Sequence, residues 1–343
     1  MNQAQGMFSP VPPAHAPAHA GRRRASTPYE RELDRAIELA RAAGRALLRH
    51  YGSVTAMLKV GGTPVTIADR ESSRILIQGL RRAFPHDAVL SEEEDGVLGA
   101  PRALRLWVVD PLDGTKEFLA QNGEFSVMLG LAVRGRGVLG VVYAPVSDTL
   151  WAGAEGVGAF VERGGVRRVL HRPAGVAPVP LRFVVSRSHP DPLVLELAER
   201  LGGGDLVPSG SVGLKCGLVA EGKSDVYVHP VPFMKSWDLC GPEVILREAG
   251  GSVTDCLGLP LRHRRTQPEQ PHGIVACGPG LAQKVMGALA PLYAERAAAA
   301  AEKDESAAAG SPGTSAPVAP VAPAAPAAAG APSDPFSATS SAS

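Results

Sequence analysis

The sequence predicts a layered α/β protein, α+β in character, that is built from two fused halves. Three observations support this fold class. Amphipathic helical periodicity begins the core, a series of short strands follows, and from about residue 182 strands alternate with helices. Because a helix stripe and a sheet face each need an apolar partner, this order indicates helices packed on sheets in layers.

Residues 29–172 form the predicted N-terminal half. Its first helix has apolar or small residues at helical spacing over Leu33–Tyr51, with charged residues between them. A second helix is expected over about Asp69–Phe84, and Pro85 ends it. Strands are expected at Ala88–Leu90, Leu104–Val109, Phe125–Val133, Val138–Tyr143, Thr149–Ala152 and Gly158–Val161. Gly turns and a Pro-Val-Ser-Asp turn separate the last three, which is typical of an antiparallel meander.

Residues 173–302 form the predicted C-terminal half. The boundary is inferred from a Pro/Ala/Gly-rich stretch at Arg172–Pro180. The expected strands are Arg182–Val185, Asp225–Val228, Ser252–Thr254 and Gly273–Ala276, and the expected helices are Asp191–Leu201, Val212–Glu221, Asp238–Ala249 and Leu281–Ala300.

The two ends of the chain differ in composition from this core. Residues 1–28 are rich in Pro and Ala, and residues 303–343 are mainly Ala, Pro and Ser. Such segments cannot bury enough apolar area to offset backbone entropy, so we expect a disordered leader and a disordered tail. The leader carries Arg22-Arg23-Arg24 but lacks the apolar segment of a secretory signal, and its prolines disfavour a helical transit peptide.

Charge and cysteine content exclude several classes of function. The 343 residues include 35 Lys and Arg against 34 Asp and Glu, so no overall field attracts nucleic acid or anionic lipid. No run of about 18 apolar residues is present, so no membrane-spanning segment is expected. The four cysteines form no Cys-x-x-Cys pair and are expected to be buried and reduced, in a cytoplasmic globular protein. The sequence leaves open whether that protein is a monomer or a dimer.

The most informative stretch is Trp107–Phe118, in which a hydrophobic strand leads into Asp110 and Asp113. Pro111 fixes φ and the glycine after Asp113 permits a sharp turn. The two carboxylates and the Leu112 carbonyl between them can therefore converge on one side of a tight turn. Oxygen ligands of this kind suit a hard cation such as Mg²⁺.

Thr115 is expected to open the next helix. Its backbone N–H and that of Gly114 then point to where an anion would bind. Carboxylates, a cation and an anion would thus meet within six residues. A purely structural interpretation is also open, in which the aspartates cap a turn and Thr115 caps a helix.

Two further acidic positions strengthen the metal hypothesis. Ser91-Glu92-Glu93-Glu94-Asp95 directly follows a predicted strand, so that one glutamate, Glu92, can reach the strand-end aspartates. Asp238 follows Trp237 and precedes a predicted helix. A solvated acidic turn and a helix cap are the alternatives for these two sites.

Taken together, these residues carry a family resemblance. Asp110-Pro-Leu-Asp-Gly-Thr115, Glu92 after a strand, and Trp237-Asp238 with Glu248-Ala-Gly-Gly251 resemble motifs of the inositol monophosphatase superfamily. The resemblance extends from about Glu30 to Leu292. It implies an αβαβα sandwich, a lithium-sensitive phosphatase activity, and two or three Mg²⁺ ions as cofactors.

Additional strings resemble one subgroup, the 3′(2′),5′-bisphosphate nucleotidases. They are Asp113-Gly-Thr-Lys-Glu-Phe118, Asn122-Gly-Glu-Phe125, Val141-Val-Tyr-Ala-Pro145, Ser186-Arg-Ser-His189 and Leu218-Val-Ala-Glu-Gly222. This resemblance implies removal of the 3′-phosphate of adenosine 3′,5′-bisphosphate, a by-product of sulfate assimilation, to give AMP. The sulfated analogue, 3′-phosphoadenylyl sulfate, is a further implied substrate. The implied partner is thus a small-molecule nucleotide bisphosphate.

The resemblance also implies roles for individual residues. The implied metal ligands are Glu92, Asp110, the Leu112 carbonyl, Asp113 and Asp238. Thr115 and Asp69 match the pair that orients and deprotonates the attacking water. The implied substrate contacts are Ser186, His189 and Lys215, together with Glu92, Leu112, Asp113, Gly114, Thr115 and Asp238. By themselves, His189 is typical of a surface histidine and Lys215 of an exposed helix charge.

Two departures from the family pattern concern the nucleotide rather than the metal ligands. Lys235 lies where some bacterial relatives carry an Arg, and Lys offers a point charge instead of a bidentate fork. Pro208–Lys215 matches the family's Gly-Ser-Ser-Leu-Lys only loosely. An inositol monophosphatase or a broad sugar-phosphate phosphatase is therefore an alternative function. A nucleotide sensor without catalysis and a scaffold acting through its tail are alternatives of other classes.

Overall fold

The computed structural model describes residues 27–309 except 55–56, 59–63, 101, 174, 176–178 and 233. Most of the predicted leader and tail lies outside these residues. The chain divides into two compact units, Met1–Ala297 and Ala298–Ser343. None of the described helices is long and apolar enough to cross a lipid bilayer. All four cysteines are buried and free, as predicted.

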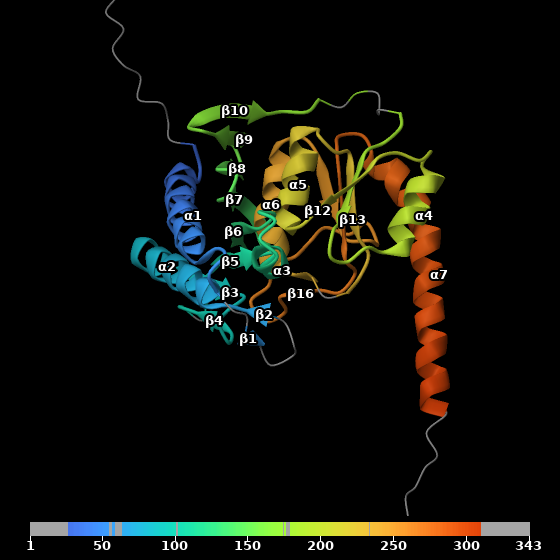
Figure 1. Cartoon of the computed structure of the whole chain (residues 1–343), viewed down its shortest axis with the longest axis horizontal. Coiled ribbons are helices and arrows are strands. Elements are labelled where there is room, and N and C mark those ends of the chain that lie inside the picture. The colour runs from blue at the N-terminus through green and yellow to red at the C-terminus, as the bar shows by residue number, and fades with distance from the viewer. Residues whose placement is uncertain are drawn as a thin grey trace, which may run out of the picture. The chain divides into compact units, whose positions relative to one another are not determined.

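An eight-stranded sheet forms the N-terminal part of the fold, and two helices cover one of its faces (Figure 1). The helices are α1 (Glu30–His50) and α2 (Ile67–Ala83). In spatial order the strands are β10 (Val166–Leu170), β9 (Gly158–Arg163), β8 (Thr149–Ala154), β7 (Arg136–Ala144), β6 (Ser126–Val133), β5 (Arg105–Asp113), β3 (Ala88–Ser91) and β4 (Val97–Leu98). Neighbours are antiparallel except β3 and β5, which are parallel.

A five-stranded sheet forms the C-terminal part. Its order is β12 (Leu206–Ser209), β11 (Phe183–Ser186), β13 (Val226–His229), β17 (Ile274–Cys277) and β15 (Ser252–Thr254). Helices α5 (Val212–Glu221) and α6 (Ser236–Glu248) lie between the two sheets, and α4 (Pro192–Arg200) lies on the outer face with the first part of α7 (Ala282–Ala309) (Figure 1). The remaining elements are α3 (Thr115–Leu119) and two short ladders, β1 (Met57–Leu58) with β2 (Pro64–Val65) and β14 (Met234–Lys235) with β16 (Glu269–Gln270).

Three large apolar cores, and a smaller one between α6 and strands β3, β5 and β6, hold these layers together. The first joins α1 and α2 to the eight-stranded sheet, for example through Leu47, Leu76 and Trp107. The second fills the space around α5 and α6 between the sheets. The third joins the outer face of the five-stranded sheet to α4 and α7, for example through Phe183 and Leu197. The αβαβα sandwich implied by the sequence is therefore confirmed. The division into halves near residue 172 stays a prediction.

Most elements lie within a few residues of their predicted bounds, and three differences have clear causes. Helix α2 begins at Ile67, because Thr66 caps it by accepting a hydrogen bond from the Ala68 N–H. Helix α6 begins at Ser236, before its predicted start, because Asp238 lies inside its first turn and accepts from the Lys235 N–H at 2.6 Å. Strands β10 and β12 were not predicted; both lie at sheet edges and are largely exposed, so they lack the apolar alternation of inner strands.

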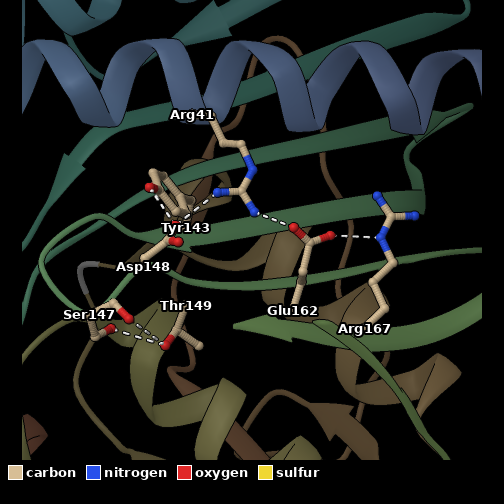
Figure 2. Close-up of polar contacts among 7 residues, drawn as sticks. All are labelled: Arg41, Tyr143, Ser147, Asp148, Thr149, Glu162 and Arg167. Atoms are coloured by element: carbon tan, nitrogen blue, oxygen red, sulfur yellow. Dashed lines mark hydrogen bonds and ion pairs between the residues drawn. The ribbon is translucent and has the colours of Figure 1, made fainter. Parts of the chain in front are cut away.

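Helix α1 is tied to the sheet by Arg41 (Figure 2). Its Nη1 donates to Asp148 Oδ1 at 2.8 Å and its Nη2 to Glu162 Oε1 at 2.6 Å. The guanidinium carbon lies 5.0 Å from the centroid of the Tyr143 ring. Glu162 also accepts from Arg167 Nε at 2.7 Å. These contacts link α1 to the turn between β7 and β8 and to the outer strands β9 and β10.

Helix α6 packs against β6 and β7 with almost no side chain between the backbones. A Cβ built at Gly140 would lie 2.0 Å from the Gly241 carbonyl oxygen, and one at Gly130 would lie 2.5 Å from Cys240 Sγ. Conversely, a Cβ at Gly241 would lie 2.6 Å from the Leu129 carbonyl oxygen. Only glycine fits at these positions, and the three glycines fix how closely the start of α6 approaches the sheet.

This packing predicts a specific effect of Gly140→Ala. The added methyl group meets backbone rather than a flexible side chain, so α6 must move, at a cost of about 1–3 kcal/mol. Urea denaturation should show the loss as a lower midpoint. Gly287→Ala in α7 is the matched control, because nothing lies within 4 Å of a Cβ there and alanine favours a helix. Equal midpoints for the two variants would contradict this account of the packing.

Candidate active site

Three aspartates meet where the end of β5 faces the first turn of α6. One carboxylate oxygen from each of Asp110, Asp113 and Asp238 lies within 4.8 Å of the other two. Asp110 is only 1% exposed. Three buried or half-buried carboxylates so close together repel one another, and a bound cation would relieve that repulsion.

The backbone of β5 differs here from the predicted tight turn. The strand continues through Asp113, and its register with β6 shifts between Asp110 and Asp113. A bulge of this kind bends the strand and redirects side chains. The Leu112 N–H donates to Asp110 Oδ1 at 3.0 Å, which holds that carboxylate against the bulge. The prediction of a turn was wrong, while the predicted convergence of Asp110 and Asp113 is confirmed.

Glu92 reaches the same place because β3 and β5 are parallel. Ser91 pairs with Val109, so the next residues, Glu92 and Asp110, lie side by side at the carboxyl ends of the two strands. The Glu92 N–H donates to the Val109 carbonyl at 3.3 Å. The Glu92 carboxylate contributes to raising the pKa of both Asp110 and Asp238.

The pKa values of the cluster report its electrostatics. Burial raises the pKa of Asp110 well above its ordinary value, and the charges of Glu92, Asp113 and Asp238 raise it further. Burial and then Asp113 do the same to the pKa of Asp238. Burial also raises the pKa of Asp113, although Lys215 opposes this effect. The raised pKa values mean that the three negative charges are poorly compensated by the positive charges nearby. The ligand atoms of the cluster are all oxygen, which fits Mg²⁺.

Asp113 has a hydrogen-bonding partner that the sequence did not indicate. The Ser211 hydroxyl donates to Asp113 Oδ2, and the Gly213 N–H at the start of α5 donates to the same oxygen at 3.1 Å. These bonds leave the other carboxylate oxygen for a cation. No motif singled out Ser211, which becomes adjacent only when the two sheets are stacked.

Thr115 and Asp69 are brought together, as expected. Thr115 Oγ1 lies 3.5 Å from Asp69 Oδ1 and 3.4 Å from the Leu112 carbonyl oxygen. The other Asp69 oxygen accepts from the N–H and the hydroxyl of Thr66, both at 2.7 Å. Burial raises the pKa of Asp69, and the bonds from Thr66 oppose the increase. Asp69 thus serves both the cap of α2 and the hydroxyl of Thr115.

A pocket of about 280 Å³ joins these groups to the C-terminal part of the fold. The predicted site residues that line it are Glu92, Asp113, Gly114, Thr115, Ser186, His189, Lys215 and Asp238. Asp69, Asp110 and Leu112 are not among the described residues that line this pocket. A larger pocket of about 950 Å³ beside α2 shares only Glu92 with it, and the smaller one holds the site.

The three expected nucleotide contacts differ in their surroundings. Ser186 Oγ accepts from the His189 N–H at 3.2 Å, and the exposed His189 ring faces Lys116. Lys215 is 2% exposed, so the interpretation as an exposed helix charge was wrong. Its ammonium donates to the Gly210 carbonyl and lies 5.3 Å from the centroid of the Tyr227 ring. Burial lowers the pKa of Lys215, and Asp113 opposes that shift.

Lys235 does not take the place of the missing arginine. Its ammonium donates to Glu269 Oε1 at 2.8 Å, and it is absent from the described residues that line the site pocket. Lys116, Glu117 and His229 do line that pocket, although the sequence gave them no role. Lys116 and Glu117 directly follow Thr115 in the sequence, and this adjacency could have indicated that they line the site.

Comparison with known proteins places this geometry in a family. The sequence profile of the Inositol monophosphatase family matches residues 29–298. The chain belongs to the inositol monophosphatase family. Members of this family depend on a metal, and the acidic cluster of this member is a site that could hold one. Its biochemical class is accordingly a phosphatase that hydrolyses phosphate monoesters.

Individual relatives refine the family relationship. The 3′(2′),5′-bisphosphate nucleotidase CysQ of Escherichia coli is 39% identical over 233 residues, which is 67% of this chain and 92% of that protein. The crystal structure of CysQ from Bacteroides thetaiotaomicron has a TM-score of 0.62 at 32% identity, covering 73% of this chain and 98% of that one. An IMPase from Thermotoga maritima has a TM-score of 0.65 at 27% identity, covering 77% and 99%.

The acidic cluster predicts that Mg²⁺ stabilises the folded chain through Asp113. The melting temperature should rise with Mg²⁺ concentration, because the ion binds the folded state alone. Asp113→Asn should remove most of that rise and lower turnover by about 100-fold or more, since metal-ion charge stabilisation contributes several kcal/mol. Asp205→Asn, at an exposed position away from the cluster, is the control and should retain the full rise. A rate for Asp113→Asn near one third of wild type would refute the ligand assignment.

Proposed function

We propose that this chain is a Mg²⁺-dependent 3′(2′),5′-bisphosphate nucleotidase. Its substrate would be adenosine 3′,5′-bisphosphate, and 3′-phosphoadenylyl sulfate a second one; the products from the first are AMP and phosphate. One observation carries the proposal: carboxylates for cations and basic groups for a second anion line the same small pocket. The 39% identity to a protein named for this activity supports the choice of substrate.

The proposed reaction is hindered by repulsion between two negatively charged reactants. A phosphate monoester is an anion that repels the hydroxide needed to cleave it, and its uncatalysed hydrolysis is extremely slow. Magnesium ions supply a site for charge neutralisation and lower the pKa of bound water. Glu92, Asp110, the Leu112 carbonyl, Asp113 and Asp238 would hold two or three of these ions. The raised pKa values of the three aspartates indicate that a bound cation would stabilise their ionised forms.

Thr115 and Asp69 would then act on the attacking water. The Thr115 hydroxyl can donate a hydrogen bond to Asp69 Oδ1 and at the same time accept one from the attacking water. Asp69 Oδ1 is the atom that receives the proton. A carboxylate with a raised pKa is a better acceptor near neutral pH than an ordinary aspartate. No Ser, Cys or His nucleophile is needed in this scheme.

An inositol monophosphatase activity is the second candidate. It is favoured by the match to the IMPase of Thermotoga maritima at 27% identity over 99% of that chain. Initial rates with Mg²⁺ on adenosine 3′,5′-bisphosphate and on inositol 1-phosphate separate the two. Faster hydrolysis of inositol 1-phosphate would overturn the nucleotidase proposal. Phosphate release from either compound would exclude a non-catalytic sensor.

The remaining proposals concern the setting of the enzyme. The proposed location is the cytoplasm, where the four buried thiols would stay reduced. The scaffold alternative is tested by deleting residues 310–343. Full activity of the shortened chain in cells would count against a function that acts through the tail.

The pairing of Thr115 with Asp69 predicts non-additive effects. Thr115→Ala and Asp69→Asn should each lower kcat by ~10²–10⁴, and the double variant should be little worse than either one. Asp69→Asn should also lose stability, by about 0.5–2 kcal/mol, because Asp69 belongs to the cap of α2.

Thr66→Ala is the matched control for the pair. It weakens the same cap and leaves the carboxylate of Asp69 in place, so it should lower the melting temperature without a comparable loss of kcat. If Thr115→Ala keeps full activity and only melts earlier, Thr115 is a structural residue.

A further inference from the structure

A buried serine of α2 forms a hydrogen bond with the backbone of β5. Ser72, in the second turn of α2, donates from its hydroxyl to the Pro111 carbonyl oxygen at 2.7 Å, and Ser72 is 0% exposed. A serine inside a helix usually faces solvent or bonds to the carbonyl four residues before it. Ser72 instead reaches from the helix layer to a strand 39 residues further along the chain.

The peptide that Ser72 binds lies in the bulge of β5. In the described strands, neither Pro111 nor Leu112 has a pairing partner on β6 or β3, and the register with β6 shifts between Asp110 and Asp113. Pro111 is buried, and a buried backbone carbonyl without a partner costs free energy. The Ser72 hydroxyl therefore supplies a partner for this carbonyl where the pairing of the strands is interrupted.

The other end of the same peptide binds the carboxylate of Asp110. Its N–H belongs to Leu112 and donates to Asp110 Oδ1 at 3.0 Å. The peptide is trans, so its C=O and its N–H point in opposite directions. Because Ser72 directs the C=O toward α2, the N–H is directed away from α2 and toward Asp110. One hydroxyl thus fixes the orientation of the donor that holds the carboxylate.

Asp110 depends on this donor more than Asp113 depends on any one of its own. Within the described part of the chain, the Leu112 N–H is the only hydrogen-bond donor to the Asp110 carboxylate. Asp113 accepts from both the Ser211 hydroxyl and the Gly213 N–H. A rotation of the peptide after Pro111 would therefore leave the Asp110 carboxylate without a bond that sets its direction.

We propose that Ser72 is a positioning residue of the cation site and orients Asp110 through the peptide between Pro111 and Leu112. The inference rests on the proposed function, in which Asp110 is a ligand of Mg²⁺. Ser72 is absent from the described residues that line the site pocket, so it acts through Asp110 alone. Asp69 lies three residues earlier, on the same face of α2. One helix thereby holds both the proposed proton acceptor and the peptide that orients a cation ligand.

Titration calorimetry with magnesium chloride tests the role of the Ser72 hydroxyl. Ser72→Ala removes the donor, so the peptide is free to rotate and Asp110 loses its fixed direction. The dissociation constant for Mg²⁺ should rise by about 10- to 100-fold, the usual effect of losing a group that orients a metal ligand. An unchanged constant would overturn the inference, even if the variant melted earlier, because Ser72 would then contribute to stability alone.

Ser72→Cys separates the hydrogen bond from the packing. The thiol fills the space of the hydroxyl and is only a weak donor, so this variant should also bind Mg²⁺ more weakly than wild type. Wild-type affinity in Ser72→Cys would overturn the inference, because filling the space would then be sufficient.

Ser73→Ala is the matched control. Ser73 is the next residue of α2 and is 2% exposed, and its Oγ lies 3.3 Å from Ser91 Oγ. This substitution also removes a buried hydroxyl and changes helix propensity by the same amount, but the lost contact is with a side chain rather than a peptide. The dissociation constant for Mg²⁺ should stay near its wild-type value. A rise equal to that of Ser72→Ala would overturn the inference.

Hydrogen exchange of the metal-free protein separates this inference from the proposed function. The Leu112 amide, followed by NMR, should exchange about tenfold faster in Ser72→Ala than in wild type, because the peptide has lost one of its two bonds. Neither this measurement nor the Mg²⁺ titration needs a substrate. A wild type that binds Mg²⁺ and hydrolyses neither nucleotide would refute the nucleotidase proposal and leave the inference to these two measurements. Equal exchange rates at Leu112, or a wild type that does not bind Mg²⁺, would overturn the inference.

Discussion

The site depends on how closely α6 approaches the eight-stranded sheet. Asp238 lies in the first turn of α6, whereas Asp110 and Asp113 lie on β5. Their carboxylate oxygens lie within 4.8 Å of one another, and glycines allow the close approach of α6 to the sheet. Burying three repelling carboxylates opposes folding. The apolar packing of α6 between the sheets offsets that cost before any cation binds.

Local backbone geometry then distributes the remaining groups around this contact. The parallel pairing of β3 and β5 delivers Glu92 beside Asp110, and the bulge in β5 turns Asp113 toward α5. Five residues of helix follow at once, so Thr115 and Lys116 are fixed to the same rigid segment as Asp113. One short stretch of chain thereby contributes to the cation site, the water-orienting pair and the basic end of the pocket.

The sequence predicted those parts of the site that depend on strand ends and short motifs. Glu92, Asp110 and Asp113 could be placed together because residues at the carboxyl ends of neighbouring strands share one edge of a sheet. The burial of Lys215 could not be predicted, since it results from Tyr227 on β13 and from carbonyls of the preceding loop. Ser211 escaped notice for the same reason, because its partner Asp113 lies 98 residues away in the sequence.

Acidic and basic side chains occupy different parts of the site pocket. Carboxylates with raised pKa values lie where β5 meets α6, and a histidine with a lowered pKa lies beside a lysine where α3 meets the segment after β11. The first group favours cations, and the Lys116 ammonium of the second favours an anion. A metal-bound phosphate satisfies the first group alone, since its charge is already neutralised. The pocket thus has a cation-binding end and a basic end, which is the arrangement that the proposed bisphosphate substrate requires.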